Sequence, residues 1–357
     1  MNSSTTTLEN RRRTTTRQRQ FTHASQVGEI SRRHFVDCSF TGMEWRNVVA
    51  DDVQFENCRF INAQFVDCTI SSALWLKCTL QNVVWQACTL ERCNMIDSTM
   101  QNTKVVGGHL RYCNLNRTQF KDLTFENVMS KHCVMTELSI QHLQMLGGVW
   151  RDDIWAQCRL TALHADGCEL LRSVFADCPI DESQWSKCSG SHVRWTKCSL
   201  TQVALRDCSF VQPAWSGSHW GIGEIERCTL PNACLDNTTL QQLRVVDTTM
   251  SMALFDAAKL TECEFVRLQA GGISLRGASL QQVNLRNALL DRLDACGASL
   301  QNVDLRGAQV RNARLLRQDQ KLWINADVEG SQFQEETVMD EMHWWEKHQP
   351  GVRESLS

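Results

Sequence analysis

The chain has 357 residues, of which 42% are hydrophobic and 22% are charged, and its formal net charge is −3. No uncharged apolar run approaches the roughly 18 residues that a membrane-spanning helix needs, and we expect no cleaved secretory signal at the N-terminus. The nearly balanced charge disfavours a dedicated nucleic-acid binder, which is usually basic.

The first segment of the chain, residues 1–33, is rich in serine, threonine, arginine and glutamine. It contains seven arginines and two glutamates but almost no apolar residues. Such a composition cannot bury enough apolar surface to offset the ordering of the chain. The sequence therefore predicts disorder up to about Ile30.

A five-residue repeat begins at Phe35 and continues to Leu315. Reading every fifth residue over this range gives 57 positions without an insertion or deletion, and 51 of them are Val, Ile, Leu, Met, Phe or Trp. Four of the others are alanine, and only Ser130 and Gly190 depart further. A fixed period of this length is the sequence signature of a solenoid.

A second column of small or moderately apolar residues precedes each large residue by two positions. It holds sixteen of the eighteen cysteines, all except Cys234 and Cys296. Two inward residues separated by one outward residue have the period of a strand, and the next inward residue comes three later, which requires a corner. Four such corners close a square coil of twenty residues, so residues 34–316 should form about fourteen coils.

The sequence resembles the pentapeptide-repeat family, most closely between residues 278 and 310. There the chain reads Val283-Asn284-Leu285-Arg286-Asn287 and Val303-Asp304-Leu305-Arg306-Gly307-Ala308. The resemblance implies an all-β fold, a right-handed quadrilateral β-helix. The chain departs from the family motif by its cysteines and by tryptophan at nine large positions, so we expect coils that are locally wider or distorted.

The residues that suggest chemistry also have structural interpretations. Cysteines twenty residues apart should stack near 4.8 Å in a filled core, where thiols act as small apolar filler; a metal or redox site is the alternative. The Gly107–Gly108 and Gly147–Gly148 pairs indicate positive φ angles or a loosened corner. No catalytic group, metal site or cofactor site stands out, so we predict a protein that is not an enzyme and binds no cofactor or small-molecule substrate.

The last segment, residues 317–357, is acidic, with nine acidic and four basic side chains. Val338, Met342 and Trp345 have helical spacing, and Ser331 and Gln334 resemble a capping box. We expect an amphipathic helix over 332–347 that covers the last coil, because an open β-edge invites aggregation. The alternative is a partner-binding or homodimer interface at the C-terminal end that exposes Trp344 and Trp345.

Arginines concentrate in the last coils before this segment, which makes them basic. They are Arg267, Arg276, Arg286, Arg292, Arg306, Arg311, Arg314 and Arg317. A solvated face is one interpretation, and a surface for an anionic partner is the other. Among them we take Arg286, Arg306, Arg311 and Arg314, together with Trp344 and Trp345, as the candidate interaction residues.

The leading functional hypothesis is a scaffold or adaptor in a bacterial cytoplasm, which binds one or more protein partners. The resemblance of the chain to long pentapeptide-repeat proteins that accompany type VI secretion suggests an accessory of that secretion system. The unstructured N-terminus would instead suit an effector exported by a route other than Sec. Family members that bind gyrase imitate DNA through acidic surfaces, but the repeat region here has 26 basic and 29 acidic residues, which disfavours that function.

Overall fold

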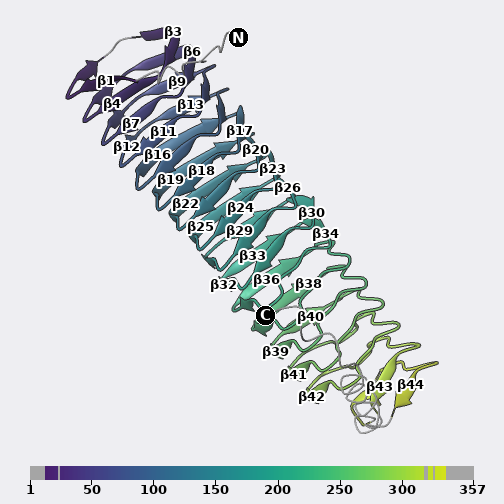
Figure 1. Ribbon diagram of the computed structural model, residues 1–357. Helices are drawn as coiled ribbons and strands as arrows, with labels where there is room; N and C mark the ends of the chain where they lie inside the picture. Colours follow the sequence, from purple (N-terminus) through teal and green to yellow (C-terminus); the bar gives the residue numbers. More distant parts are fainter. Residues whose placement is uncertain (1–12, 23–24, 317–320, 325, 335–357) are drawn as a thin grey trace, which may run out of the picture. The chain divides into compact units, whose positions relative to one another are not determined.

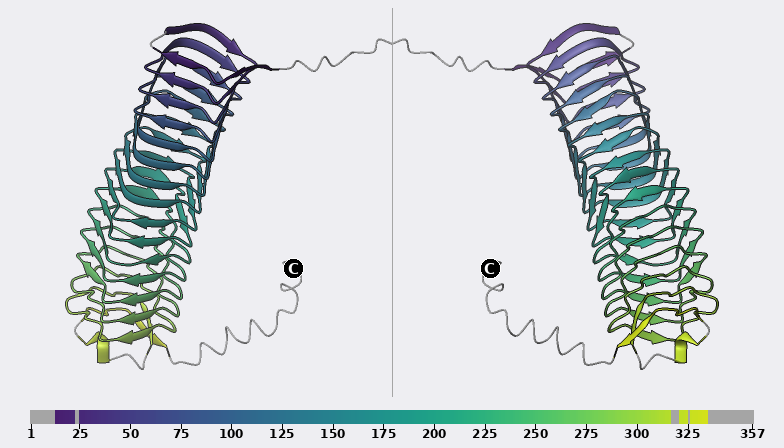
Figure 2. Two further views of the ribbon diagram at one scale, coloured as in Figure 1. Left: turned by 90° about the vertical axis from the view of Figure 1, so that its left-hand side faces the viewer. Right: turned by 90° about the vertical axis from the view of Figure 1, so that its right-hand side faces the viewer.

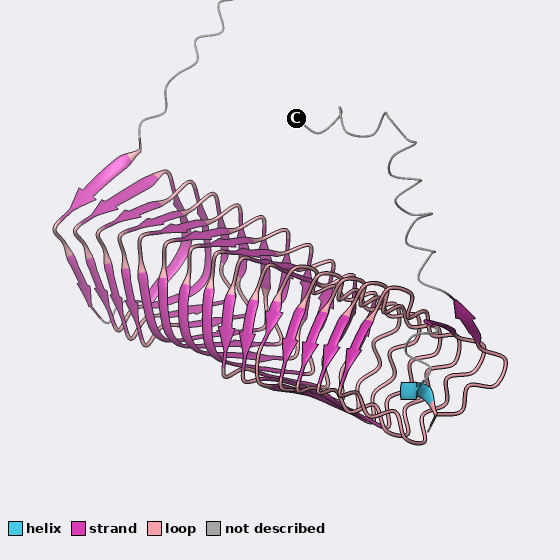
Figure 3. Ribbon diagram, turned by 90° about the horizontal axis from the view of Figure 1, so that it is seen from below, coloured by secondary structure: helices cyan, strands magenta, loops and turns pink. Residues whose placement is uncertain are grey.

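The predicted twenty-residue coil is present in the computed structural model, which describes residues 13–22, 25–316, 321–324 and 326–334. Almost all of this is parallel β-solenoid, about sixteen turns in total. The one helical element in the described ranges is a 3-10 turn at 321–323 (Figure 3). Among the described residues, no helix is long and apolar enough to cross a membrane. The chain divides into unit 1, residues 1–153, and unit 2, residues 154–357, which are described separately.

In unit 1 the strands stack in parallel with their neighbours one coil away (Figure 1). In chain order they are β1 (Thr14–Arg17), β2 (Gln20–Thr22), β3 (Ser25–Ser31), β4 (Arg33–Val36), β5 (Ser39–Thr41), β6 (Glu44–Asp51), β7 (Gln54–Glu56), β8 (Arg59–Ile61), β9 (Gln64–Val66), β10 (Thr69–Ser71), β11 (Leu74–Leu76), β12 (Thr79–Gln81), β13 (Val84–Gln86), β14 (Thr89–Glu91), β15 (Asn94–Ile96), β16 (Thr99–Val106), β17 (His109–Arg111), β18 (Asn114–Asn116), β19 (Gln119–Glu126), β20 (Met129–Lys131), β21 (Val134–Thr136), β22 (Ser139–Leu146) and β23 (Val149–Arg151).

In unit 2 the strands stack in the same way, and several faces of the later coils are reduced to single bridges between turns (Figure 2). The strands are β24 (Ile154–Ala156), β25 (Arg159–Asp166), β26 (Glu169–Leu171), β27 (Val174–Ala176), β28 (Pro179–Asp181), β29 (Gln184–Ser186), β30 (Ser189–Ser191), β31 (Arg194–Thr196), β32 (Ser199–Thr201), β33 (Val203–Arg206), β34 (Ser209–Val211), β35 (His219–Trp220), β36 (Gly223–Glu226), β37 (Thr239–Gln241), β38 (Leu243–Val246), β39 (Lys259–Thr261), β40 (Glu264–Val266), β41 (Ser279–Gln281), β42 (Ser299–Gln301), β43 (Arg314–Leu316) and β44 (Gln332–Gln334).

The register confirms the predicted inward columns. Trp75 pairs with Phe55 on one side and Met95 on the other, each twenty residues away, and all three side chains are buried. The sixteen cysteines of the small column are buried as well, with exposed fractions of 4% or less. Two inward residues in every five thus fill the interior, and the outward residues form columns that repeat every coil.

The tryptophans fit this register by stacking on aromatic rings of the next coil. In unit 1 the rings of Phe65 and Trp85 lie 3.9 Å apart and nearly parallel. In unit 2 the rings of Trp195 and Trp215 lie 5.0 Å apart in the same way. A local departure occurs at Gly223, where a Cβ atom would lie 2.5 Å from Nε1 of Trp220, so the missing side chain makes room for the indole.

The predicted corner recurs every five residues as a left-handed backbone conformation. Two positions after each large inward residue, the non-glycine residues between Asp37 and Asn312 that adopt positive φ have values from 46° to 61°. The glycines of the two Gly-Gly pairs also have positive φ, between 62° and 84°, which confirms that interpretation. Outward side chains at the corners therefore stand above one another along the stack.

The solenoid begins earlier than the sequence pattern predicted, and the expected disorder up to Ile30 is wrong for the described part of that segment. Strands β1 and β2 pair with β4 and β5 at an offset of nineteen residues, and the Phe21 ring stacks on Phe40 at 4.9 Å. The offset returns to twenty after a bulge between Gln26 and Gly28. This coil has one residue fewer, so its large residues fall outside the five-residue phase.

The solenoid also continues past Leu315, into the segment that was assigned to an acidic tail. Strand β44 pairs with β43 at an offset of eighteen residues, so 332–334 are strand and not the start of a helix. The Ser331 hydroxyl donates to the Val310 carbonyl and accepts from the Ala313 N–H, and therefore does not cap a helix. The rest of the predicted helix, with Trp344 and Trp345, lies outside the described residues.

Candidate interaction surfaces

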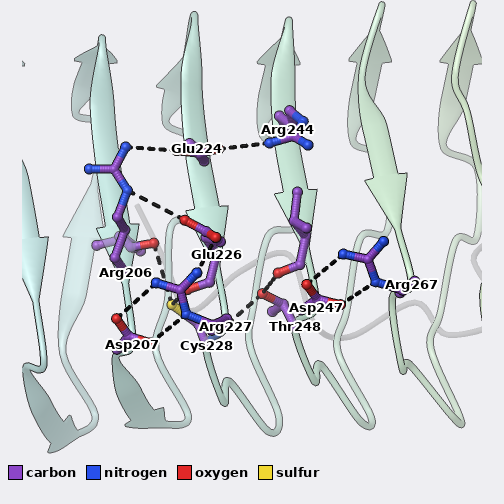
Figure 4. A network of polar contacts seen from close by, with 12 residues as sticks. Arg206, Asp207, Glu224, Glu226, Arg227, Cys228, Arg244, Asp247, Thr248 and Arg267 are labelled. Atoms are coloured by element: carbon purple, nitrogen blue, oxygen red, sulfur yellow. Dashed lines mark hydrogen bonds and ion pairs between the residues drawn. The ribbon is translucent and has the colours of Figure 1, made fainter.

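The outward columns of unit 2 carry charges that alternate in sign along the stack. One corner column reads Lys187, Asp207, Arg227, Asp247 and Arg267, each twenty residues from the next. Arg227 binds the Asp207 carboxylate through two hydrogen bonds of 2.7 and 3.0 Å, and Arg267 binds Asp247 in the same way (Figure 4). These guanidinium groups hold the pKa of both carboxyls below the usual range.

The neighbouring face of unit 2 continues this network across three adjacent strands. The Glu224 carboxylate on β36 accepts hydrogen bonds from Arg206 on β33, at 2.8 Å, and from Arg244 on β38, at 2.9 Å (Figure 4). The Arg206 guanidinium, more than that of Arg244, lowers the pKa of this carboxyl. The charges are satisfied within unit 2, so the network ties coils together.

The four arginines that were taken as candidate interaction residues are paired in the same manner. Arg286 and Arg306 both donate to the Asp304 carboxylate, at 2.5 and 2.7 Å. Arg311 donates to Asp327 at 2.7 Å. Arg314 donates to Asp294 at 3.3 Å, and Arg276 binds the same carboxylate. Their side chains remain about half exposed, their charge is compensated only in part because Asp304 and Asp294 each serve two arginines, and their role in binding stays a prediction.

Unit 1 carries a column of three cations that is not compensated, which we name the basic stripe: Arg111, Lys131 and Arg151. They lie directly beside one another on β17, β20 and β23, and all three are exposed. Glu91 on β14 stands next to Arg111 in the same column but is bound to Arg92, and no ion pair to any of the three is found among the described residues. Like charges side by side on neighbouring strands are destabilising, so this column costs the fold stability.

Apolar and aromatic side chains lie on both sides of the basic stripe. On the same strands, His109, Met129 and Val149 occupy the other outward column, and Met129 is 49% exposed. At the adjoining corner, the Tyr112 ring stacks on His132 with centroids 5.1 Å apart, and Tyr112 is also 49% exposed. Sequence reasoning missed this surface because it counted charges along segments and not along the twenty-residue columns.

A shallow pocket of about 330 Å³ opens on the next face of unit 1. Its lining is mainly amide and apolar: Asn94, Ile96, Asn114, Leu115, Asn116, Arg117, Val134 and Thr136. The single charged group in this lining, Arg117, is bound to the Asp97 carboxylate at 2.7 and 3.2 Å. These residues can bind a partner's polar groups, but they bring together no acid, base or nucleophile.

A buried polar cluster lies in the core of unit 1, where Ser130, Cys133 and Asp153 are at most 2% exposed. The Asp153 carboxylate accepts a hydrogen bond from the Cys133 N–H at 2.8 Å, and its other oxygen has no hydrogen-bond partner among the described residues. Burial raises the pKa of Asp153 to about 7. A substrate cannot reach this cluster, so we assign it to stability.

The inward cysteines act as small polar filler. The Cys68 sulfur lies 3.2 and 3.4 Å from the carbonyl oxygens of Trp45 and Val66. At the same position of another coil, Ser98 donates to the Ile96 carbonyl at 2.9 Å. None of the eighteen cysteines, all of which lie among the described residues, forms a disulfide, and these residues contain no group of three potential ligands that could hold a metal ion.

Thiol labelling checks this assignment of the cysteines. Only Cys234 and Cys296 are partly exposed, so we expect an aromatic disulfide reagent to modify two thiols in the native protein and eighteen in urea. Cys296 should react slowly and faster at higher pH, because burial and the Asp294 carboxylate raise its thiol pKa to about 11. The Cys234→Ser/Cys296→Ser variant is the control and should show no native labelling. More than two reactive native thiols would contradict the packing.

Comparison with known proteins gives one family match. The model of the pentapeptide repeats family matches residues 278–315 as eight copies. No curated protein matches the sequence.

Several solved structures are similar to this one. HetL, a pentapeptide-repeat protein involved in the regulation of heterocyst differentiation in the cyanobacterium Nostoc sp. strain PCC 7120, is 18% identical; the match covers 62% of this chain and 89% of HetL, with a TM-score of 0.37. QnrB1, a plasmid-mediated fluoroquinolone resistance protein, is 15% identical over 54% of this chain and 98% of its own, with a TM-score of 0.26. A mannuronic-acid-specific polysaccharide lyase from human gut microbiota is 9% identical over 92% and 88%, with a TM-score of 0.26.

Proposed function

The chain is a pentapeptide-repeat protein, and we propose that it is a non-enzymatic scaffold that binds a protein partner through unit 1. The observation that carries the proposal is the basic stripe of Arg111, Lys131 and Arg151. Three like charges stand in register and form no ion pair among the described residues, beside an exposed methionine. A partner that supplies negative charge would relieve their repulsion, and the apolar column would add buried area.

The contrast with unit 2 supports this choice of surface. There many arginines bind an aspartate or glutamate one coil away in the same unit, as Arg227 binds Asp207 and Arg286 binds Asp304. If a partner's carboxylate replaced the aspartate or glutamate of such a pair, the existing hydrogen bonds would break and the free energy of binding would gain little. A partner therefore gains more at the basic stripe, where no internal bond has to be broken.

The other functional hypotheses have less support from the described residues. Strands β1, β2 and β3 lie at 14–17, 20–22 and 25–31, so much of the segment that suggested an export signal belongs to the first coil. Imitation of DNA needs uncompensated acidic columns, whereas Asp304 and Asp294 are each bound by two arginines. The proposal draws no support for the type VI secretion hypothesis from the described residues.

Photo-crosslinking tests the scaffold function. A photoreactive phenylalanine analogue at position 129 should form adducts with a protein in the cells that produce this chain. The same analogue at Met252 of unit 2 is the matched control, because Met252 is 52% exposed and Met129 49%. Adducts at position 129 should disappear in the Lys131→Glu/Arg151→Glu background. If position 129 gives no adduct, or an adduct that survives this charge reversal, the basic stripe is not the binding surface.

A further inference from the structure

We propose that the basic stripe binds the acidic C-terminal segment, residues 335–346, of a second copy of this chain. The inference rests on the proposed function and names its partner. It joins two features that differ in kind: a described surface with unpaired cations, and a segment of the same sequence with the opposite charge.

The surface offers two parallel columns of different chemistry. The strands β17, β20 and β23 are neighbours, so the cations of the basic stripe follow one another at the strand spacing of about 4.8 Å. Two residues away on the same strands, roughly 6.6 Å along the backbone, His109, Met129 and Val149 form the second column, which is apolar on β20 and β23. A ligand that fits this face therefore has carboxylates along one side and apolar side chains along the other.

The segment 335–346 has this composition. It contains five acidic residues, Glu335, Glu336, Asp340, Glu341 and Glu346, and no lysine or arginine. Between the acids it carries five large apolar residues, Val338, Met339, Met342, Trp344 and Trp345. It is the most acidic apolar-rich stretch in the C-terminal part of the chain, and it requires no second protein species.

The apolar column favours a peptide over a nucleic acid as the ligand. Phosphates would match the cations of the stripe, and the Tyr112–His132 pair at the adjoining corner offers an aromatic face, but Met129 and Val149 offer a nucleic acid neither a hydrogen bond nor a stacking surface. Burial of the exposed Met129 side chain against Met342 or a tryptophan would be favourable by the hydrophobic effect. The peptide satisfies both columns, whereas a nucleic acid satisfies one.

If the segment comes from a second copy, its contact with the stripe does not depend on how units 1 and 2 of one chain are arranged. The segment follows β44 in unit 2, and the stripe lies in unit 1. Contact between different patches of two identical chains is a heterologous interface, which grows into open chains or closes into rings. Because the attraction is between exposed charges, association should weaken as ionic strength rises.

A charge-swap experiment on the full chain tests the proposal. Variant A carries Arg111→Glu, Lys131→Glu and Arg151→Glu; variant B carries Glu335→Lys, Glu336→Lys, Asp340→Lys and Glu341→Lys. Sedimentation velocity across a concentration series should show self-association of the wild type that is at least about tenfold weaker in A alone and in B alone, because each then opposes like charges. An equimolar mixture of A and B should associate again, which also shows that both variants are folded.

The control reverses three other exposed cations of unit 1, Arg59→Glu, Lys77→Glu and Lys121→Glu, and should leave association unchanged. A wild type that remains monomeric at every concentration, or a mixture of A and B that does not associate, would overturn the inference. If association fails while position 129 still crosslinks to another protein in cells, the scaffold function stands and only its partner is different. Wild-type chains that associate only when RNA or DNA is added would identify a nucleic acid as the ligand instead.

Discussion

Replacement of Asp153 by serine is expected to raise the free energy of unfolding by roughly 3 to 4 kcal/mol at pH 8. The wild-type carboxylate is fully buried and one of its oxygens has no hydrogen-bond partner among the described residues. Serine occupies the equivalent position of the five-residue repeat on another face, where Ser98 accepts from the Cys78 N–H and donates to the Ile96 carbonyl. The substitution therefore keeps the hydrogen bond to Cys133 and removes a buried charge.

The same substitution should change how stability depends on pH. Burial raises the Asp153 pKa from 3.8 to about 7. Between these values the folded protein holds a proton that the unfolded chain releases, so the free energy of unfolding falls as pH rises from about 4 to 7 and is level above that. The serine variant lacks this fall, so the gain should be largest above pH 7 and smallest near pH 4.

Urea unfolding at pH 4.5, 6 and 8, followed by tryptophan fluorescence, measures this effect as the shift in midpoint. Asp67→Ser is the control, because Asp67 is an exposed corner residue and Ser72 occupies the next corner with nearly the same φ. It should leave both the midpoint and its pH dependence nearly unchanged. A serine variant at 153 that is less stable than the wild type, or that keeps the same pH profile, would show that the carboxylate is stabilised by its surroundings.

Replacement of Gly108 by alanine should have a large effect of the opposite sign, a loss of roughly 3 to 5 kcal/mol. Gly108 has a φ of 81°, and a Cβ there would lie 2.8 Å from the Cys88 nitrogen and closer still to its carbonyl oxygen. That carbonyl accepts the His109 N–H, a bond between successive coils. The methyl group would push the coils apart at this bond, in addition to the strain of a left-handed alanine.

The adjacent residue is a matched control for this prediction. Gly107 also has positive φ, but a Cβ there meets nothing within 4 Å. Alanine already stands at the corner one coil earlier, at Ala87, with a φ of 51°. Gly107→Ala should therefore cost about 1 kcal/mol, the left-handed strain alone. Similar urea midpoints for the two variants would show that close approach of the backbone does not limit position 108.

The sequence alone predicted the coil from Phe35 to Leu315 because five-residue spacing needs no knowledge of contacts. The described parts of both ends differ from the prediction for one reason. The first coil pairs at nineteen residues and the last at eighteen, so Phe21 and Ser331 fall out of phase although they occupy inward positions. The five-residue spacing identifies the interior coils reliably. A terminal coil has a neighbouring coil on one side only, so it can close with fewer residues.

The surfaces were harder to predict than the core because charge pairing depends on columns. Counted along the chain, the last coils looked basic. The arginines there pair with carboxylates eighteen or twenty residues away, as Arg286 does with Asp304 and Arg267 with Asp247. When the sequence is written in rows of twenty residues, it does reveal the corner column of unit 2, in which the charges alternate in sign, and the basic stripe of unit 1. Orientation of each guanidinium still requires coordinates.

The two spacings of the coil, five residues for the interior and twenty for the surface, restrict how such a gene can change in length. Loss of one residue inside a unit would turn every later inward side chain outward. Loss of five would preserve the interior but move each later column to the next face, so that Arg227 would no longer stand above Asp207. Only duplication or deletion of whole coils keeps both the packing and the surface, and we expect natural length variants to differ by multiples of twenty codons.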